Sequence, residues 1–184
     1  DPGFDTLSAD PYALCPADGR DGPDGPDRMM PVSVTWDADL EAWTKPYFMA
    51  PMNAKVVRRS NALMGYPYGR DFQYSEAVIT GPGFAGHAKA LTLATALGGL
   101  AVGAAFRPSR YLLSQFVLPK PGEGPSRHQR ENGFFNLRLI GSYQDGRQIR
   151  ATVTADRDPG YGATSGMLAE SAVCLAGDIS RDDV

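Results

Sequence analysis

The spacing of apolar residues along the chain predicts three helices and a strand. Apolar positions recur at helical intervals over residues 53–64, and Gly65 follows as a residue that commonly ends a helix. Two further helices are predicted over residues 84–105, a stretch rich in Ala and Gly, and over residues 161–176. Aromatic and β-branched residues in "FQYSEAVIT", residues 72–80, instead predict a strand before the second helix.

Alternation of apolar and polar residues predicts a β-hairpin around Gly146. A two-residue turn at Asp145 and Gly146 would mix apolar and polar residues on one face. A three-residue loop over 144–146, with Gly146 left-handed, instead gives one apolar face. We therefore expect the cross-strand pairs Phe135 with Ala155, Leu137 with Val153, and Leu139 with Ala151.

These elements predict an α+β fold with a mixed, largely antiparallel sheet and helices packed on one face. The 184 residues are enough for one domain with its own core. Residues 1–31 are expected to form a loop or linker, because they hold seven Asp and six Pro with Gly between them. We therefore expect the folded domain to occupy residues 32–184.

Composition and charge argue against several kinds of partner. A net charge of −3 and a pI near 5.3 do not suit a protein that must neutralise phosphates, so no nucleic acid is expected. Cys15 and Cys174 lack the spacing of a metal site, and only two His are present, so no metal is expected. We expect reduced thiols in a cytoplasmic protein, with one disulfide as the alternative. The first residues, "DPGFDTLSADPYALCP", do not resemble a signal peptide, and the chain reads as one entered in mid-sequence.

A glycine pattern before the second helix has two interpretations. Gly81, Gly83 and Gly86 match the G-x-G-x-x-G of dinucleotide-binding folds, and they lie between a predicted strand and a predicted helix. Such a fold needs an acidic residue at the end of the next strand, but no Asp or Glu occurs from Gly86 to Leu118. We therefore favour a helix entry turn and expect no cofactor-binding residue in this chain.

The second predicted helix contains an uncharged stretch, "ALTLATALGGLAVGAAF" at residues 90–106. Its length is just under the roughly 20 residues that span a bilayer, and its glycines and alanines allow close approach of neighbouring backbones. Three interpretations stay open: a buried core helix, the wall of an acyl-chain pocket, or a contact with a membrane surface. A cytoplasmic protein that associates with a membrane is therefore one alternative.

Five segments together carry a resemblance to a known family: "DPYALCP", "MNAKVVRRSNALMGYPYG", "FQYSEA", "PKPGEGPS" and "DRDPGYGATSGMLAESAVCLA". The chain resembles the C-terminal half of the saccharopine dehydrogenase-like oxidoreductases, especially the branch that includes the mycobacterial trans-acting enoyl reductases. The resemblance runs through almost the whole chain and is most specific at residues 55–69 and 156–176.

The resemblance implies an NAD(P)-dependent oxidoreductase in which this chain is the second domain, with substrate-side and dimerisation contacts. The Rossmann domain that binds NAD(P) in such proteins would precede Asp1, so this chain alone is expected to bind no cofactor and to be inactive. The implied partners are that Rossmann domain, a second copy in a homodimer, and a lipid-like or acyl substrate of an enoyl reductase. The alternative is a non-catalytic module that binds a lipid or acyl group or docks to a membrane.

Three residues of the first predicted helix are candidates for substrate contacts. Consecutive helical residues point about 100° apart, so at most one of Arg58 and Arg59 can lie fully toward a cleft. Either guanidinium could hold a carboxylate or a thioester carbonyl. We take Arg59 as catalytic and Arg58 as substrate-binding, with pairing to Asp as the structural alternative. Asn61 is a further substrate-binding candidate that could polarise a carbonyl or equally satisfy a neighbouring loop.

The segment "DRDPGYGATSGMLAES" joins the hairpin to the last helix and carries the other candidates. Asp158 is expected as the N-cap of this helix and Pro159 in its first turn. The amides near Gly160 and Gly162 would make a pole that attracts a substrate anion. Tyr161 is the candidate proton donor, because a positive helix end favours its anionic form and helps it to release a proton. Its alternative role is to pack over the hairpin.

Overall fold

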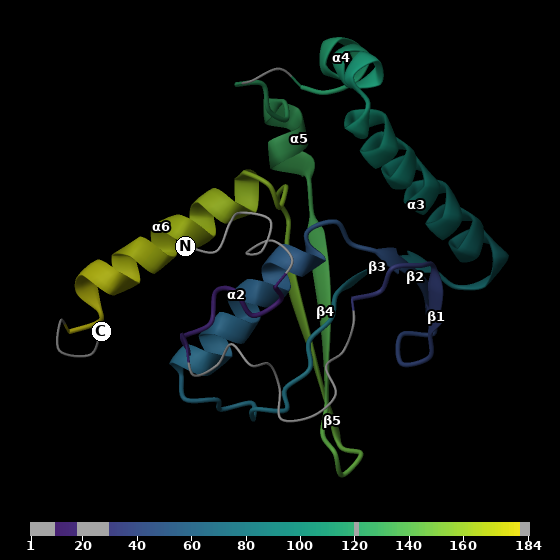
Figure 1. The fold of residues 1–184 in the computed structure, drawn as a ribbon. Coiled ribbons are helices and arrows are strands. Elements are labelled where there is room, and N and C mark those ends of the chain that lie inside the picture. The colour runs from purple at the N-terminus through teal and green to yellow at the C-terminus, as the bar shows by residue number, and fades with distance from the viewer. Residues whose placement is uncertain (1–9, 18–29, 120–121, 181–184) are drawn as a thin grey trace. The chain divides into compact units, whose positions relative to one another are not determined.

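The computed structural model describes residues 10–17, 30–119 and 122–180, and it forms two compact units, Asp1–Leu113 and Ser114–Val184. Its helices and small antiparallel sheets confirm the α+β class (Figure 1). The strands make two separate sheets, one of three strands and one of two, and all the pairs in them are antiparallel. The described strands therefore do not join into the one mixed sheet that we expected.

The predicted linker, residues 1–31, falls largely outside the described residues. The structure describes residues 10–17 of it, which form turns, and residues 30 and 31. Its assignment as a linker, and that of residues 32–184 as one domain, stays a prediction.

The first unit is built on a three-stranded antiparallel sheet in the spatial order β1 (Thr35–Asp37), β2 (Ala42–Pro46) and β3 (Ala77–Gly81). Trp36 and Trp43 are register partners, and their rings pack edge to face with centroids 5.7 Å apart. The hydroxyl of Thr80 donates to the carbonyl of Trp43 at 2.9 Å. Only the last part of the predicted strand over residues 72–80 is a strand, because the residues before it are tied to a helix by side-chain hydrogen bonds instead.

The helices of this unit are α2 (Ala50–Leu63) and α3 (Gly83–Ala105), followed by α4 (Arg107–Phe116) at the boundary between the units. Helix α2 begins three residues earlier than predicted, because Pro51 fits the first turn of a helix. Gly65, with φ of 77°, follows the helix end and supplies the left-handed residue that the sequence predicted there. The predicted helix over residues 84–105 is confirmed as α3.

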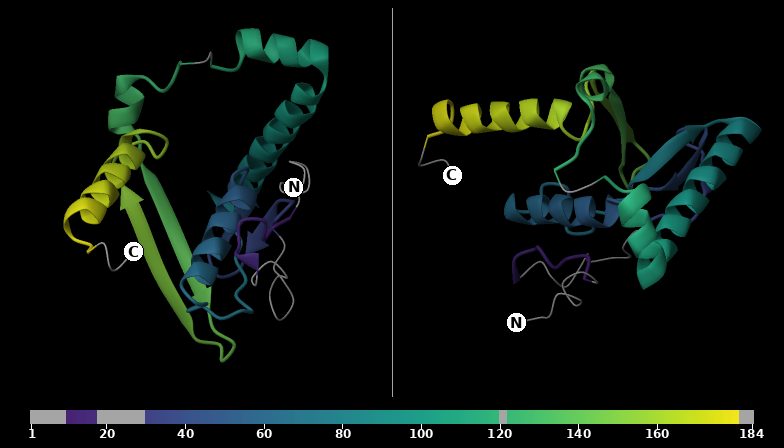
Figure 2. Two further views of the ribbon diagram at one scale, coloured as in Figure 1. Left: turned by 60° about the vertical axis from the view of Figure 1, so that its left-hand side comes forward. Right: turned by 90° about the horizontal axis from the view of Figure 1, so that it is seen from above.

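Helix α3 packs on β2 and β3 through its first turns. Gly86 and Ala90 are its buried residues, and the imidazole of His87 lies against the ring of Trp43, with centroids 4.1 Å apart. The helix then leads away from the sheet toward α4 (Figure 1 and Figure 2). By length and composition alone α3 could cross a membrane, and only 6% of its most apolar stretch of 18 residues is buried. The described residues therefore do not enclose α3 as a core helix.

The three glycines at the start of α3 serve a tight corner between strand and helix. Gly81 has φ of 114° and Gly83 has φ of 61°, which are left-handed values that favour glycine. A Cβ on Gly86 would lie 2.0 Å from the carbonyl oxygen of Gly81. Since β3 pairs antiparallel with β2, this corner does not lie in the parallel βαβ unit that binds a dinucleotide. The geometry thus favours the helix entry turn.

The second unit contains the hairpin that the sequence predicted, with β4 (Phe135–Ser142) and β5 (Gln148–Ala155). The register pairs Phe135 with Ala155, Leu137 with Val153, and Leu139 with Ala151. Gly146 is left-handed with φ of 86°, and its N–H donates to the carbonyl of Tyr143 at 3.0 Å. The three-residue loop and the apolar face are therefore confirmed.

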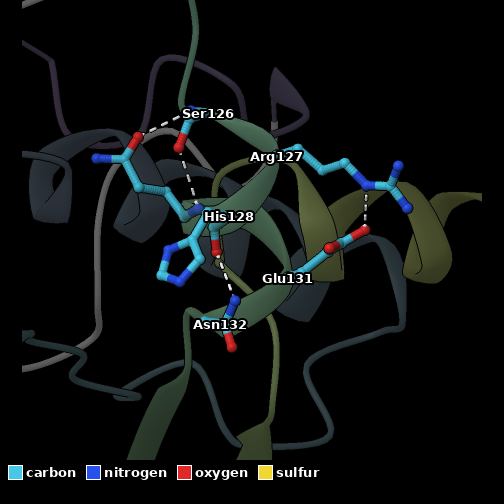
Figure 3. A network of polar contacts seen from close by, with 6 residues as sticks. Ser126, Arg127, His128, Glu131 and Asn132 are labelled. Carbon is cyan, nitrogen blue, oxygen red and sulfur yellow. Dashed lines mark hydrogen bonds and ion pairs between the residues drawn. The ribbon is translucent and has the colours of Figure 1, made fainter.

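Two helices flank the hairpin in this unit: α5 (Arg127–Asn132) and α6 (Gly162–Gly177). Helix α5, which was not predicted, starts with a capping box (Figure 3). The Ser126 hydroxyl accepts the backbone N–H of Gln129 at 3.2 Å, and Oε1 of Gln129 accepts the backbone N–H of Ser126 at 2.8 Å. Helix α6 matches the predicted helix over residues 161–176 with each end shifted by one residue.

The described residues enclose mainly small side chains. The buried apolar residues are six alanines and Cys15, and no large side chain in the described part of the chain is fully buried. The apolar face of the hairpin is half open, with Leu137 51% and Val153 47% exposed. Cys174 is half-buried, and no disulfide joins it to Cys15. The fold therefore leaves apolar surface uncovered, which is typical of regions that contact another molecule or segment.

Replacing Gly86 by Ala tests the corner before α3. The new methyl group would meet the Gly81 carbonyl oxygen, so we expect the free energy of unfolding to fall by about 1–3 kcal/mol. The matched control is Gly98→Ala on the same helix, where an added Cβ meets nothing within 4 Å and should raise the stability by roughly 0.5–1 kcal/mol. Urea unfolding measures both. Equal effects of the two substitutions would contradict the tight corner.

Candidate functional site

Helix α2 buries three polar side chains beside two alanines, Ala50 and Ala54, and exposes some of its large apolar ones. Lys55, Arg58 and Asn61, three residues apart, are only 6, 6 and 4% exposed. Met52 and Val56 on the other side are both 57% exposed. A helix that turns polar side chains inward does so because those groups find partners there, since unsatisfied buried polar groups are costly. The first group of candidate site residues lies on this helix.

The two arginines hold the N-terminal segment over residues 10–17. The guanidinium of Arg58 lies over the ring of Tyr12, 4.7 Å from its centroid, as a cation–π contact. Arg59 is exposed, and its Nη1 donates to the carbonyl of Leu14 at 2.5 Å. Arg58 is therefore the buried one of the pair and Arg59 the accessible one, as expected for neighbours on a helix. Their roles toward a substrate stay predictions.

Asn61 binds the loop that follows α2. Its Nδ2 donates to the carbonyl of Gly69 at 3.0 Å, and its Oδ1 accepts the N–H of Tyr68 at 3.1 Å. One hydrogen bond at each end fixes the amide against this loop. Of the two roles that the sequence left open, the structure shows the loop contact, and the contact with a substrate carbonyl stays a prediction.

A network that the sequence analysis missed joins α2 to the segment before β3. Glu76 accepts from Nδ2 of Asn53 at 2.9 Å and from the hydroxyl of Tyr74 at 2.5 Å. Burial, and then the hydrogen bond to Glu76, raise the pKa of Tyr74 above its usual range, so its phenol stays neutral. The sequence signal was the alternation of Tyr74 and Glu76, which place their side chains on one side of an extended segment.

The second group of candidates lies in the turn before α6, which is built on Asp158. Its carboxylate accepts three backbone N–H groups, from Gly160 at 2.9 Å, Tyr161 at 2.9 Å and Gly162 at 2.8 Å. These bonds, that from Gly162 first, lower the pKa of Asp158. These bonds tie the Asp158 carboxylate to the start of α6, but the N-cap residue is Tyr161, so the prediction of Asp158 as the N-cap is wrong. The helix itself begins at Gly162, so Pro159 lies in the turn ahead of the first helical turn and not within it.

The amides that we expected to attract a substrate anion are therefore engaged by the chain's own carboxylate. A substrate anion at Gly160 and Gly162 would have to compete with Asp158, and their predicted binding role is untested. Gly162 has a structural reason as well, because a Cβ there would lie 2.8 Å from the carbonyl oxygen of Arg130. Tyr161 is 59% exposed, and its ring lies beside the backbone of Gly124. Its phenol is accessible to a ligand.

The two groups of candidates belong to different units. Arg58, Arg59 and Asn61 come together on α2 in the first, whereas Gly160, Tyr161 and Gly162 come together at Asp158 in the second. In the second unit, an open depression of about 510 Å³ lies at the base of the hairpin. Its lining residues are Phe134, Phe135, Asn136, Thr154, Ala155 and Asp156. Across the described ranges no cluster of three or more His, Cys, Asp or Glu could hold a metal ion.

Comparisons with known proteins identify homologues in mycobacteria. A Mycobacterium tuberculosis H37Rv protein that is provisionally named a trans-acting enoyl reductase is 36% identical over 184 residues, which cover 97% of this chain and 44% of the relative. The trans-acting enoyl reductase of Mycobacterium bovis BCG is 35% identical over 190 residues, and that of Mycobacterium ulcerans over 189. Each of these two alignments covers 98% of this chain and 44% of the relative. The chain therefore has homologues named trans-acting enoyl reductase and spans less than half of their length.

No family model matches the chain, and no solved structure matches it. The resemblance to the saccharopine dehydrogenase-like oxidoreductases as a wider family therefore stays a prediction.

The Asp158 turn predicts a pH-dependent contribution to stability. Because folding lowers the pKa of this carboxyl, the contribution is present above the unfolded pKa of about 3.9 and is lost as the pH falls through the folded value. Asp158→Asn should therefore lower the melting temperature at neutral pH, and the difference from the parent should shrink in acid. Asp156→Asn is the control, since it makes the same change two residues away. A constant difference across this pH range would contradict this role of the carboxylate.

Asn61→Ala tests the loop contact of α2. The substitution removes a buried amide that makes two part-buried hydrogen bonds, with the N–H of Tyr68 and the carbonyl of Gly69, so we expect a loss of about 1–2 kcal/mol of stability. Asn132→Ala removes a comparable amide bond, to the carbonyl of His128, at an exposed position, and should cost less than about 0.5 kcal/mol. Urea unfolding measures the loss of stability in both variants. An equal loss in the two would contradict the contact of Asn61 with the loop.

Proposed function

We propose that this chain is the substrate-side part of an NAD(P)-dependent enoyl reductase. The observation that carries the proposal is identity of 35–36% along nearly the whole chain with proteins named trans-acting enoyl reductase. In the proposal, residues 32–184 form the domain that contacts the substrate and a second copy of the chain, and residues 1–31 link it to the rest. The protein works in the cytoplasm on an acyl or other lipid-like enoyl substrate.

The glycine corner before α3 does not lie in a parallel βαβ unit, so the proposal assigns nicotinamide binding to a Rossmann domain outside this chain. The glycine corner at Gly81 lies beside an antiparallel sheet, and Gly86 is pressed against its backbone. The antiparallel pairing differs from the parallel βαβ unit in which a dinucleotide-binding glycine corner occurs. The hydride of an enoyl reduction would therefore reach the substrate from that other domain.

The residues of this chain would bind the substrate and supply the proton. Reduction of an enoyl group adds a hydride to one carbon and a proton to its neighbour, so a proton donor is needed beside the hydride path. Tyr161 has an accessible phenol at the start of α6 and is the proposed donor. In the first unit, Arg59 donates to Leu14 with one N–H of its planar fork, which has five, and is proposed as a separate contact for a carbonyl or carboxylate of the substrate.

Arg58, Asn61, Gly160 and Gly162 are proposed as surrounding substrate contacts. Arg58 and Asn61 would act indirectly, because Arg58 holds the segment of Tyr12 and Asn61 holds the loop of Gly69, and both segments contact α2. Gly160 and Gly162 would let a substrate approach the backbone beside Tyr161, because they carry no side chain there.

Oxidation of NADPH or NADH by the full-length protein, with enoyl thioesters as substrates, tests this function. Tyr161→Phe should lower kcat by roughly 100-fold or more, which is the usual contribution of a general acid, with little change in KM. Tyr143→Phe is the control, since Tyr143 is a half-exposed tyrosine at the hairpin tip. An unchanged kcat in Tyr161→Phe would remove this residue from the chemistry. Absence of any enoyl-dependent oxidation would refute the reductase itself.

A further inference from the structure

The elbow between α3 and α4 presents an apolar surface that the reductase proposal does not use. On α3, Phe84, Leu91 and Val102 are 87, 45 and 61% exposed, and their spacings of seven and eleven residues keep them on one face of the helix. Phe106, 63% exposed, follows at the corner. The exposed face therefore runs from the first turn of α3 to the elbow.

The hydroxyl groups of Thr92, Thr95 and Ser109 are satisfied within this region. The hydroxyls of Thr92 and Thr95 each donate at 2.9 Å to the carbonyl one turn earlier. The hydroxyl of Ser109 donates at 2.6 Å to the carbonyl of Gly103 and at 3.2 Å to that of Phe106, near the end of α3. Such internal bonds are what a helix needs where water is scarce, because an apolar medium offers polar groups no partner.

The charges near the elbow are all positive. No Asp or Glu occurs from Gly86 to Leu118, while Arg107 and Arg110 are exposed in the first turn of α4. Leu112, 55% exposed, lies on the opposite side of α4 from these arginines, so α4 is amphipathic. Aromatic and cationic residues beside an apolar helix face are typical of segments that lie at the boundary between lipid and water.

The packing of α3 favours a surface contact and argues against a span. Its first turns are fixed to the sheet, since Gly86 and Ala90 are buried and His87 lies on Trp43. The part from Gly98 to Ala105 is about 12 Å long, which is well short of the roughly 30 Å of a hydrocarbon core. The elbow can therefore enter one leaflet while the sheet stays in water.

We propose that the α3–α4 elbow docks the protein on an anionic lipid surface. Phe106 and the last turns of α3 enter the acyl boundary, and Arg107 and Arg110 lie at the phosphate headgroups. The opposite charges of the arginines and the lipid phosphates favour this occupant over an apolar protein face.

Cosedimentation with vesicles tests the docking surface. The purified chain should bind vesicles of phosphatidylcholine with phosphatidylglycerol better than vesicles of phosphatidylcholine alone, and salt should weaken the binding by screening. Arg107→Gln with Arg110→Gln should weaken it roughly 30-fold at low salt. The control, Arg127→Gln with Arg138→Gln, changes the net charge equally in the second unit and should bind like the parent. Absent binding, or equal binding of the two double variants, would overturn the proposal.

Phe106→Trp gives a second measurement that does not depend on charge. The tryptophan emission, taken as the difference from the parent, should shift to the blue and be quenched by brominated acyl chains when anionic vesicles are added. A blue-shifted emission without lipid, together with a dimer in analytical ultracentrifugation, would mean that a second copy covers the elbow and would overturn the proposal. Circular dichroism checks that each variant keeps its helices. These outcomes are independent of any reductase activity.

Discussion

The uneven burial of apolar side chains is the constraint on which this structure depends. Alanines and one cysteine are the apolar residues that the described part of the chain buries, while leucines, valines and phenylalanines on α2, α3 and the hairpin stay at the surface. Burial of large side chains is the main source of folding stability. Because the described part of the chain buries few large side chains, it relies on backbone hydrogen bonds and polar contacts. Its stability would rise if another surface covered its apolar faces.

The candidate sites follow from that constraint. On α2, Arg58 and Asn61 are buried beside Ala50 and Ala54 and contact Tyr12 and Gly69 on segments before and after the helix. Before α6, the carboxylate of Asp158 holds the turn by accepting three backbone N–H groups. Both sites are thus held by directional bonds, which fix side chains more tightly than loose apolar packing does.

Local patterns predicted those elements whose partners are near in sequence. The hairpin register followed from side-chain alternation and one left-handed glycine, both within a few residues of the loop. The strands β1 and β2 escaped prediction, because they are three and five residues long, and β2, which pairs with β1, has its other partner in β3, more than thirty residues later. The role of Asn61 could not be chosen from the sequence, and the contact of Arg59 with Leu14 crosses 45 residues. Helix α5 did have a signal, the Ser126 and Gln129 pair, which was overlooked.

The two outer edges of the β4–β5 ladder affect how the hairpin can meet another β-strand. It joins only two strands among the described residues, so the outer edge of each presents a row of backbone N–H and C=O groups. Long edges of this kind are templates for further strands and hence for aggregation, and proteins commonly protect them with charge. Arg138 and Arg150 lie on the polar face of the hairpin, one on each strand. Like charges at these positions disfavour an edge-to-edge approach of two such hairpins.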